Sequence, residues 1–85
     1  MPVFSKVGFQ QAYQLALAQQ APKMYRELQA TGRLEDHLKG VADEAQAMYE
    51  HQTRFLIEKH QMQAGQADAI ATEQVFVEFI QFPQE

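Results

Sequence analysis

The chain has 85 residues, with 7 lysines and arginines against 11 aspartates and glutamates, and its formal net charge is −4. This length allows a single domain over residues 1–85, and the absence of cysteine excludes disulfides, thiolate metal sites and a cysteine nucleophile. No apolar run approaches the roughly 18 residues of a membrane helix, and the N-terminus lacks the basic flank and apolar core of a signal peptide. These features predict a cytoplasmic protein.

The first part of the chain predicts two helices. Ser5 can cap a helix over residues 6–20, in which Phe9, Tyr13 and Leu17 lie on one face. Pro22 can begin a second helix over about 22–31, because proline is tolerated in the first helical turn. Gly32 follows, and glycine readily adopts the left-handed conformation that ends a helix.

The third segment predicts one long helix over about 33–63. Its seam alternates spacings of four and three residues, through Leu34, Leu38, Val41, Ala45, Met48, Gln52, Phe55, Lys59 and Met62. The stripe is widened by Ala42, Tyr49 and Leu56, and Gly65 is its expected end. Such a helix is about 45 Å long, whereas a compact monomer of this size is roughly 30 Å across. We therefore expect it to bend at Gly40 or to pack its end against another chain.

The last segment is apolar on nearly every side. Asp68 can cap a helix over about 69–81, although residues 75–80 also suit a strand whose only available partner is Pro2–Phe4. We favour the helix. A short helix that is apolar nearly all round must be covered, either by its own domain or by a partner. The candidate partner interface consists of Phe76, Val77, Ile80 and Phe82.

Together the segments predict an all-α fold, a small bundle of three or four helices that dimerisation could complete. The expected core draws on every segment. It comprises Phe9, Tyr13, Leu17, Met24, Leu28, Leu34, Leu38, Val41, Ala45, Met48, Phe55, Phe76, Phe79 and Ile80.

The sequence shows no constellation for catalysis, a cofactor or a metal. His37, Glu44, His51 and Glu58 recur every seven residues, which separates neighbours by about 10.5 Å along a helix. A single ion could bridge them only with a facing copy of the helix, so we interpret them as a polar flank. No glycine cluster resembles a phosphate-binding loop. We therefore expect neither an enzyme nor a small-molecule substrate.

A basic helical hairpin over residues 23–39 offers a different function, contact with nucleic acid. Its candidate residues are Lys23, Arg26, Arg33 and Lys39. Two observations disfavour this reading. Glu35 and Asp36 would face phosphates at the start of the second helix, and residues 43–85 have a net charge of −6, which opposes broad contact with a phosphate backbone.

Residues 25–49 carry a longer pattern, made of Tyr25, Leu28, Gly32, Arg33, Leu34, His37, Leu38, Ala45 and Tyr49. It resembles the middle of the TnpV-type small transposon-encoded proteins, with Arg33, His37 and Tyr49 in place of that family's Lys, Tyr and Phe. The tryptophan usual in the family's later helix is absent here. The resemblance implies a bacterial, cytoplasmic protein associated with a mobile element or phage, and it assigns no catalytic residue.

The sequence therefore predicts a small bacterial protein–protein interaction module without catalytic activity, which binds a second copy or another protein. The alternatives are a DNA-binding regulator that uses the 23–39 hairpin, and an inhibitor that presents its acidic half to a nucleic-acid enzyme. We expect no membrane contact, because the most apolar segment, residues 70–82, carries two glutamates and no basic residue.

Overall fold

The computed structural model describes residues 4–82, and this part of the chain forms four helices and no strand. The helices are α1 (Lys6–Gln20), α2 (Pro22–Ala30), α3 (Leu34–His60) and α4 (Ala64–Phe79). The predicted all-α bundle with a long central helix is confirmed. The strand alternative for residues 75–80 is wrong, because α4 runs through them to a C-cap at Ile80. Most of its suggested partner, Pro2–Phe4, lies outside the described residues.

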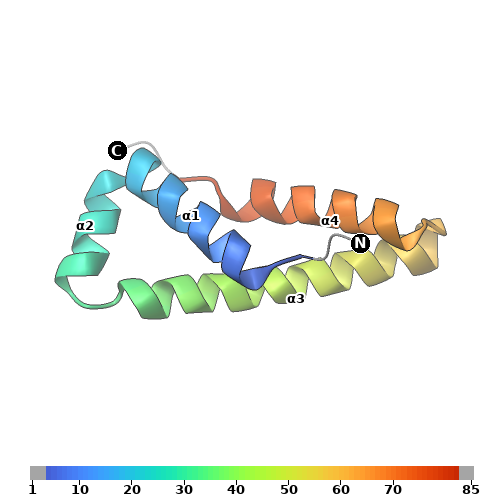
Figure 1. The fold of residues 1–85 in the computed structure, drawn as a ribbon, viewed down its shortest axis with the longest axis horizontal. Helices are drawn as coiled ribbons and strands as arrows, with labels where there is room; N and C mark the ends of the chain where they lie inside the picture. The colour runs from blue at the N-terminus through green and yellow to red at the C-terminus, as the bar shows by residue number, and fades with distance from the viewer. Residues whose placement is uncertain (1–3, 83–85) are drawn as a thin grey trace.

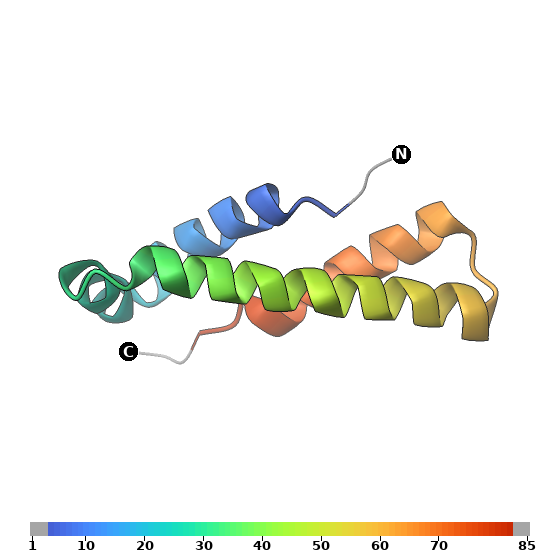
Figure 2. The ribbon, with the colours of Figure 1, turned by 90° about the horizontal axis from the view of Figure 1, so that it is seen from below.

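The longest helix, α3, forms the axis of the molecule, and the other helices pack on one side of it (Figure 1). α4 runs back antiparallel along the C-terminal part of α3, while α1 crosses the N-terminal part and α2 connects the two at that end. The start of α1 and the end of α4 project from opposite sides of α3 (Figure 2). The molecule is elongated, with principal extents of 46 × 23 × 19 Å.

The first two helices begin and end where local chemistry predicts. The Ser5 hydroxyl caps α1 by accepting the Gly8 backbone N–H at 3.0 Å. Pro22 opens α2, and Gly32 lies in the left-handed region with φ of 71°. The connection between α2 and α3 therefore uses a conformation in which a Cβ costs about 1 kcal/mol.

The boundary between α3 and α4 differs from the prediction. α3 ends at His60, and Gln61 adopts the left-handed conformation with φ of 55°. Gly65, the expected end of the third helix, instead lies in the first turn of α4, and Asp68 lies more than one turn inside that helix rather than at its cap. A cap backbone N–H donates to the Leu56 carbonyl at this end of α3, so the helix ends on a left-handed residue that is not glycine, and the glycine was a misleading signal.

The long helix does not break at Gly40, and its C-terminal part packs against α4 of the same chain. α3 continues through Gly40 without a break, and α4 covers its C-terminal part from within the same chain. The length argument assumed a nearly spherical monomer. The protein resolves the conflict by being elongated, with a radius of gyration of 14.4 Å against roughly 12 Å for a compact chain of this length.

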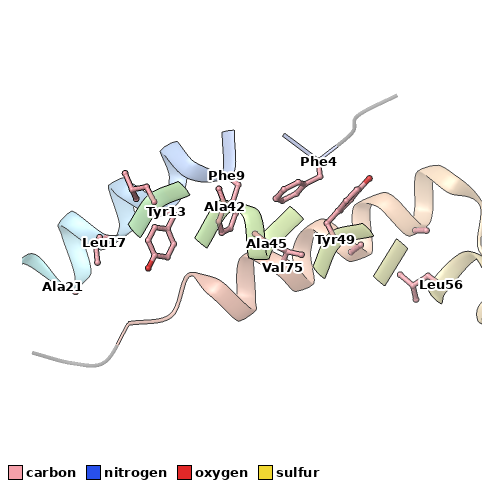
Figure 3. Close-up of a cluster of buried hydrophobic side chains, with 13 residues drawn as sticks. Phe4, Phe9, Tyr13, Leu17, Ala21, Ala42, Ala45, Tyr49, Leu56 and Val75 are labelled. Carbon is pink, nitrogen blue, oxygen red and sulfur yellow. The ribbon is translucent and has the colours of Figure 1, made fainter. Parts of the chain in front are cut away.

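Aromatic rings connect the N-terminal segment to α3 and α4, and Figure 3 shows those of Phe4, Phe9, Tyr13 and Tyr49. The Phe9 ring meets the rings of Phe76 and Phe79 edge-on, at centroid distances of 5.3 and 5.9 Å. The Phe4 ring, just before α1, stacks on Tyr49 of α3 at 5.0 Å. Such aromatic pairs each contribute about 0.5–1.5 kcal/mol beyond the area they bury, so this cluster ties the N-terminal third of the chain to α3 and α4.

The predicted core is correct except at its centre on α3. Five of its residues are buried, namely Phe9, Tyr13, Leu17, Leu38 and Ala45, and eight more are half-buried, namely Met24, Leu28, Leu34, Val41, Met48, Phe76, Phe79 and Ile80. Phe55 is wrong, because 43% of it is exposed. The centre lies one residue further along, at Ala42, Tyr49 and Leu56, which the sequence assigned only to the edge of the stripe.

This rotation of the core reflects the side of α3 on which α1 and α4 pack. Ala42 and Ala45 on α3, and Ala67 and Ala71 on α4, are all completely buried. The larger side chains of Tyr49, Leu56 and Val75 are buried with them. Phe55 lies outside this buried set, and its ring meets the His60 ring edge-on at 5.3 Å.

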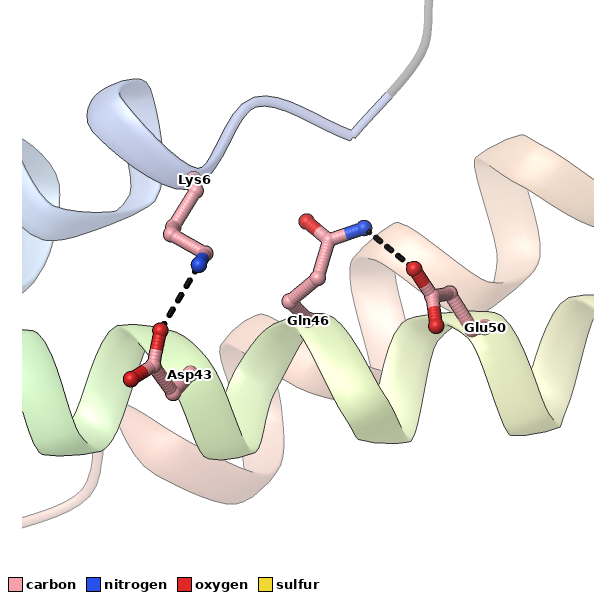
Figure 4. A network of polar contacts seen from close by, with 4 residues as sticks. All are labelled: Lys6, Asp43, Gln46 and Glu50. Carbon is pink, nitrogen blue, oxygen red and sulfur yellow. Dashed lines mark hydrogen bonds and ion pairs between the residues drawn. The ribbon is translucent and has the colours of Figure 1, made fainter.

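Polar contacts at the surface add little to the fold. The Lys6 ammonium pairs with the Asp43 carboxylate at 2.7 Å and links α1 to α3, while Gln46 donates to Glu50 at 3.0 Å along α3 (Figure 4). Both partners of the ion pair are largely exposed, and exposed pairs of this kind contribute about 0–1 kcal/mol. The stability of the fold therefore rests on the buried rings and alanines.

Replacing Gly32 or Gly40 with alanine should have opposite effects on the stability of the protein. Gly32→Ala should destabilise the protein by about 1 kcal/mol, because alanine is strained at a positive φ. Gly40→Ala should stabilise it by about 0.5–1 kcal/mol, because alanine favours a helix interior. A Cβ at either position has nothing within 4 Å, so the backbone alone decides. Urea unfolding of both variants measures this, and shifts of the same sign would contradict it.

Candidate partner-binding surface

Two grooves flank α4 on opposite sides. The first, which we call the open groove, lies between α3 and α4 and encloses about 510 Å³. It is lined by Met48 and Gln52 of α3 and by Ile70, Glu73, Gln74, Val77 and Glu78 of α4. Val77 is 55% exposed there, and Met48 and Ile70 are half-buried. The open groove therefore presents apolar side chains to solvent between two acidic ones.

The second groove, which we call the α1 groove, lies on the other side of α4 and encloses about 530 Å³. It is lined by Phe4, Ser5, Gly8, Phe9, Asp68, Ala69, Thr72 and Phe76. Asp68 is only 7% exposed, and its carboxylate accepts a hydrogen bond from the Tyr49 hydroxyl of α3. Asp68 thus fastens α4 to α3, a role that replaces the helix cap predicted for it.

The four residues of the predicted partner interface are divided by the fold. The Phe76 ring packs against Phe9, and the Phe82 ring lies edge-on to Tyr13 at 5.2 Å. Ile80 is half-buried against the core. Val77 alone of these four is largely exposed. The domain itself therefore covers most of the apolar surface of the last segment, and the remainder lies in the open groove.

The four basic residues of the predicted nucleic-acid interface lie at one end of the molecule. Lys23 and Arg26 belong to α2, Arg33 to the turn, and Lys39 to α3. All four are exposed. Three acidic residues, Glu27, Glu35 and Asp36, are exposed among them, so this end carries mixed charge rather than a uniform positive patch.

The polar flank of α3 is not arranged as a metal site within the described residues. Over residues 4–82, no three His, Asp or Glu side chains come together as potential ligands. His37 has a structural partner instead, because its Nε2 lies 2.9 Å from the Tyr13 hydroxyl. This contact joins α1 to α3 next to the ring pair of Tyr13 and Phe82.

The sequence analysis did not predict the open groove, although it had noted the spacing of the apolar residues on α3. Met48, Gln52 and Phe55 were assigned to the buried seam at spacings of four and three. The same spacing recurs at Ile70, Gln74 and Val77 on α4, and this second run could have indicated a matching stripe. Which side of each stripe faces the core depends on the helix pairing, which the sequence pattern leaves open.

No family model matches this chain, and no curated protein or solved structure is similar enough to count as a relative. Among the helices of residues 4–82, none combines the length and apolar character that crossing a bilayer requires. The function must therefore be inferred from the surface of the molecule.

The bond between Tyr49 and Asp68 predicts a loss of stability at alkaline pH. Burial, together with the Asp68 hydrogen bond, raises the pKa of the Tyr49 phenol above its ordinary value of 10.0. Burial also raises the pKa of Tyr13. Above pH 10 the unfolded chain releases these protons while the folded chain retains them, so the free energy of unfolding should fall as pH rises through the folded pKa values.

Tyr49→Phe tests this coupling. The variant should lose about 1–3 kcal/mol at neutral pH, because buried Asp68 then lacks its donor. Its stability should also fall less steeply above pH 10 than that of the wild type, with a remaining slope from Tyr13. Urea unfolding at neutral and alkaline pH measures both effects, and identical alkaline slopes for the two proteins would contradict the assignment.

Proposed function

We propose that this protein is a small helical protein–protein interaction module without catalytic activity. The proposal rests on Val77, which is more than half exposed in the open groove, where the half-buried Met48 and Ile70 also lie. The fold covers most of the remaining apolar surface of the C-terminal segment. Exposed apolar groups within a hollow, rimmed by polar residues, are typical of interaction sites.

The proposal also includes the origin and the cellular location of the module. The resemblance of residues 25–49 to TnpV-type proteins supports a bacterial cytoplasmic protein encoded by a mobile element or phage. Its partner is a second copy or another protein. The aromatic groups along the α1 groove pack mainly on one another, which makes the open groove the better candidate for the contact.

The main test compares two valine substitutions in the tagged full-length chain. Val77→Lys should reduce capture of the partner from a nuclease-treated bacterial lysate by about tenfold or more, because a charge replaces an apolar contact in the groove. Val7→Lys is the matched control, since Val7 is 67% exposed on α1, away from the groove. It should capture the partner as the wild type does. Circular dichroism checks that both variants fold.

Two results would contradict the proposal. One is the absence of any stoichiometric protein partner together with a monomer in light scattering. The other is equal capture by Val77→Lys and wild type. Capture that disappears with nuclease would instead support the DNA-binding alternative, which is favoured by the exposure of all four basic residues of the hairpin. In that case charge reversal at Arg26 and Arg33 should abolish binding to duplex DNA at low salt.

A further inference from the structure

Both walls of the open groove present side chains at helical spacing. Met48 and Gln52 lie four residues apart on α3, and Ile70, Gln74 and Val77 follow one another at spacings of four and three residues on α4. On a helix this spacing places side chains in one row, and the α4 row extends about 10.5 Å. Two antiparallel helices with such rows provide the packing surface that a third helix occupies in a bundle.

The charge of the open groove indicates the chemistry of that third helix. Two glutamates, Glu73 and Glu78, line it, and none of the described residues that line it is Lys, Arg or His. Both glutamates are exposed, so cationic side chains at the edge of a docked helix could reach them. An acidic rim around an apolar floor is complementary to a helix with one apolar face and basic flanks.

A second copy of this chain fits the groove poorly. In a two-fold symmetric contact the same patch meets itself, which would bring Glu73 and Glu78 of both copies together without a compensating positive charge. The basic helix of this chain, α2, is also unsuitable as an occupant. Its apolar residues Met24, Tyr25 and Leu28 already pack against its own core, so the α2 helix of a second copy would have no free apolar face to insert.

We propose that the open groove binds a cationic amphipathic helix of a different protein, with Met48, Ile70 and Val77 contacting its apolar face and Glu73 and Glu78 contacting its basic flanks. This inference rests on the proposed function and names the class of partner. The groove accommodates about two turns of helix, since Ile70, Gln74 and Val77 on its α4 wall span about two turns.

The test uses a fluorescent peptide of about 14 residues, made of leucine and lysine with the leucines at helical spacing. Fluorescence anisotropy should show saturable binding to the full chain that weakens as salt increases. A peptide with glutamate in place of lysine should not bind. A scrambled leucine–lysine peptide of identical composition should bind at least about tenfold more weakly, because its apolar residues cannot form one face.

Charge-matched variants of the protein distinguish binding in the open groove from general electrostatic attraction to an acidic surface. Glu73→Gln with Glu78→Gln should weaken binding by about three- to tenfold and flatten its salt dependence. Glu50→Gln with Glu58→Gln removes the same charge from a hollow elsewhere on α3, and should change binding less than about twofold. Val77→Lys should weaken binding at least about tenfold, and Val7→Lys should have no such effect.

Four outcomes would overturn the inference. They are equal binding of the scrambled peptide, equal losses in the two double-glutamine variants, binding that survives Val77→Lys, and a concentration-dependent dimer that Val77→Lys dissociates. These are distinguishable from failure of the proposed function. If Val77→Lys abolishes capture from lysate but the leucine–lysine peptide does not bind, the proposed interaction module is supported and the proposal of a cationic helical partner is wrong.

Discussion

The close antiparallel packing of α4 on α3 is the contact on which the rest of the structure depends. Four alanines, Ala42, Ala45, Ala67 and Ala71, are completely buried, and the Tyr49 hydroxyl donates to the Asp68 carboxylate in the same layer. Tyr49, Leu56 and Val75 are buried in the same layer, so small and large side chains together form the contact. The two grooves lie beside α4, on either side of this layer.

The aromatic cluster decides which of the two grooves is filled. Phe9 meets Phe76 and Phe79 from α1, and Phe4 stacks on Tyr49, so rings brought by the N-terminal segment occupy much of one side of α4. Nothing equivalent within the described residues covers the other side, where Val77 faces solvent. The apolar C-terminal segment is thus covered on one side by its own domain, and only its opposite side is open to a partner.

Basic and acidic residues are distributed unevenly over the molecule. Four exposed basic residues lie at the α2 end, where Glu27, Glu35 and Asp36 accompany them, and Lys6, Arg54 and Lys59 are exposed elsewhere. Glu73 and Glu78 line the open groove. Apolar and acidic groups therefore occur together at the groove, whereas the α2 end has no comparable hollow lined by exposed apolar residues among those described. This juxtaposition is the basis of the proposed cationic partner.

Local chemistry by itself determined the number, type and approximate extent of the helices. Ser5, Pro22 and Gly32 act on backbone groups within a few residues, so their effects on α1, α2 and the turn can be predicted from the sequence. The heptad-like spacing likewise predicted which residues lie near the core. Tertiary structure decided the rest: the rotation of α3 by one residue, the reversal at Gln61, the partnership of Asp68 and the exposure of Val77. Each of these depends on which helices meet and on which of their faces are in contact, and local sequence patterns do not specify that pairing.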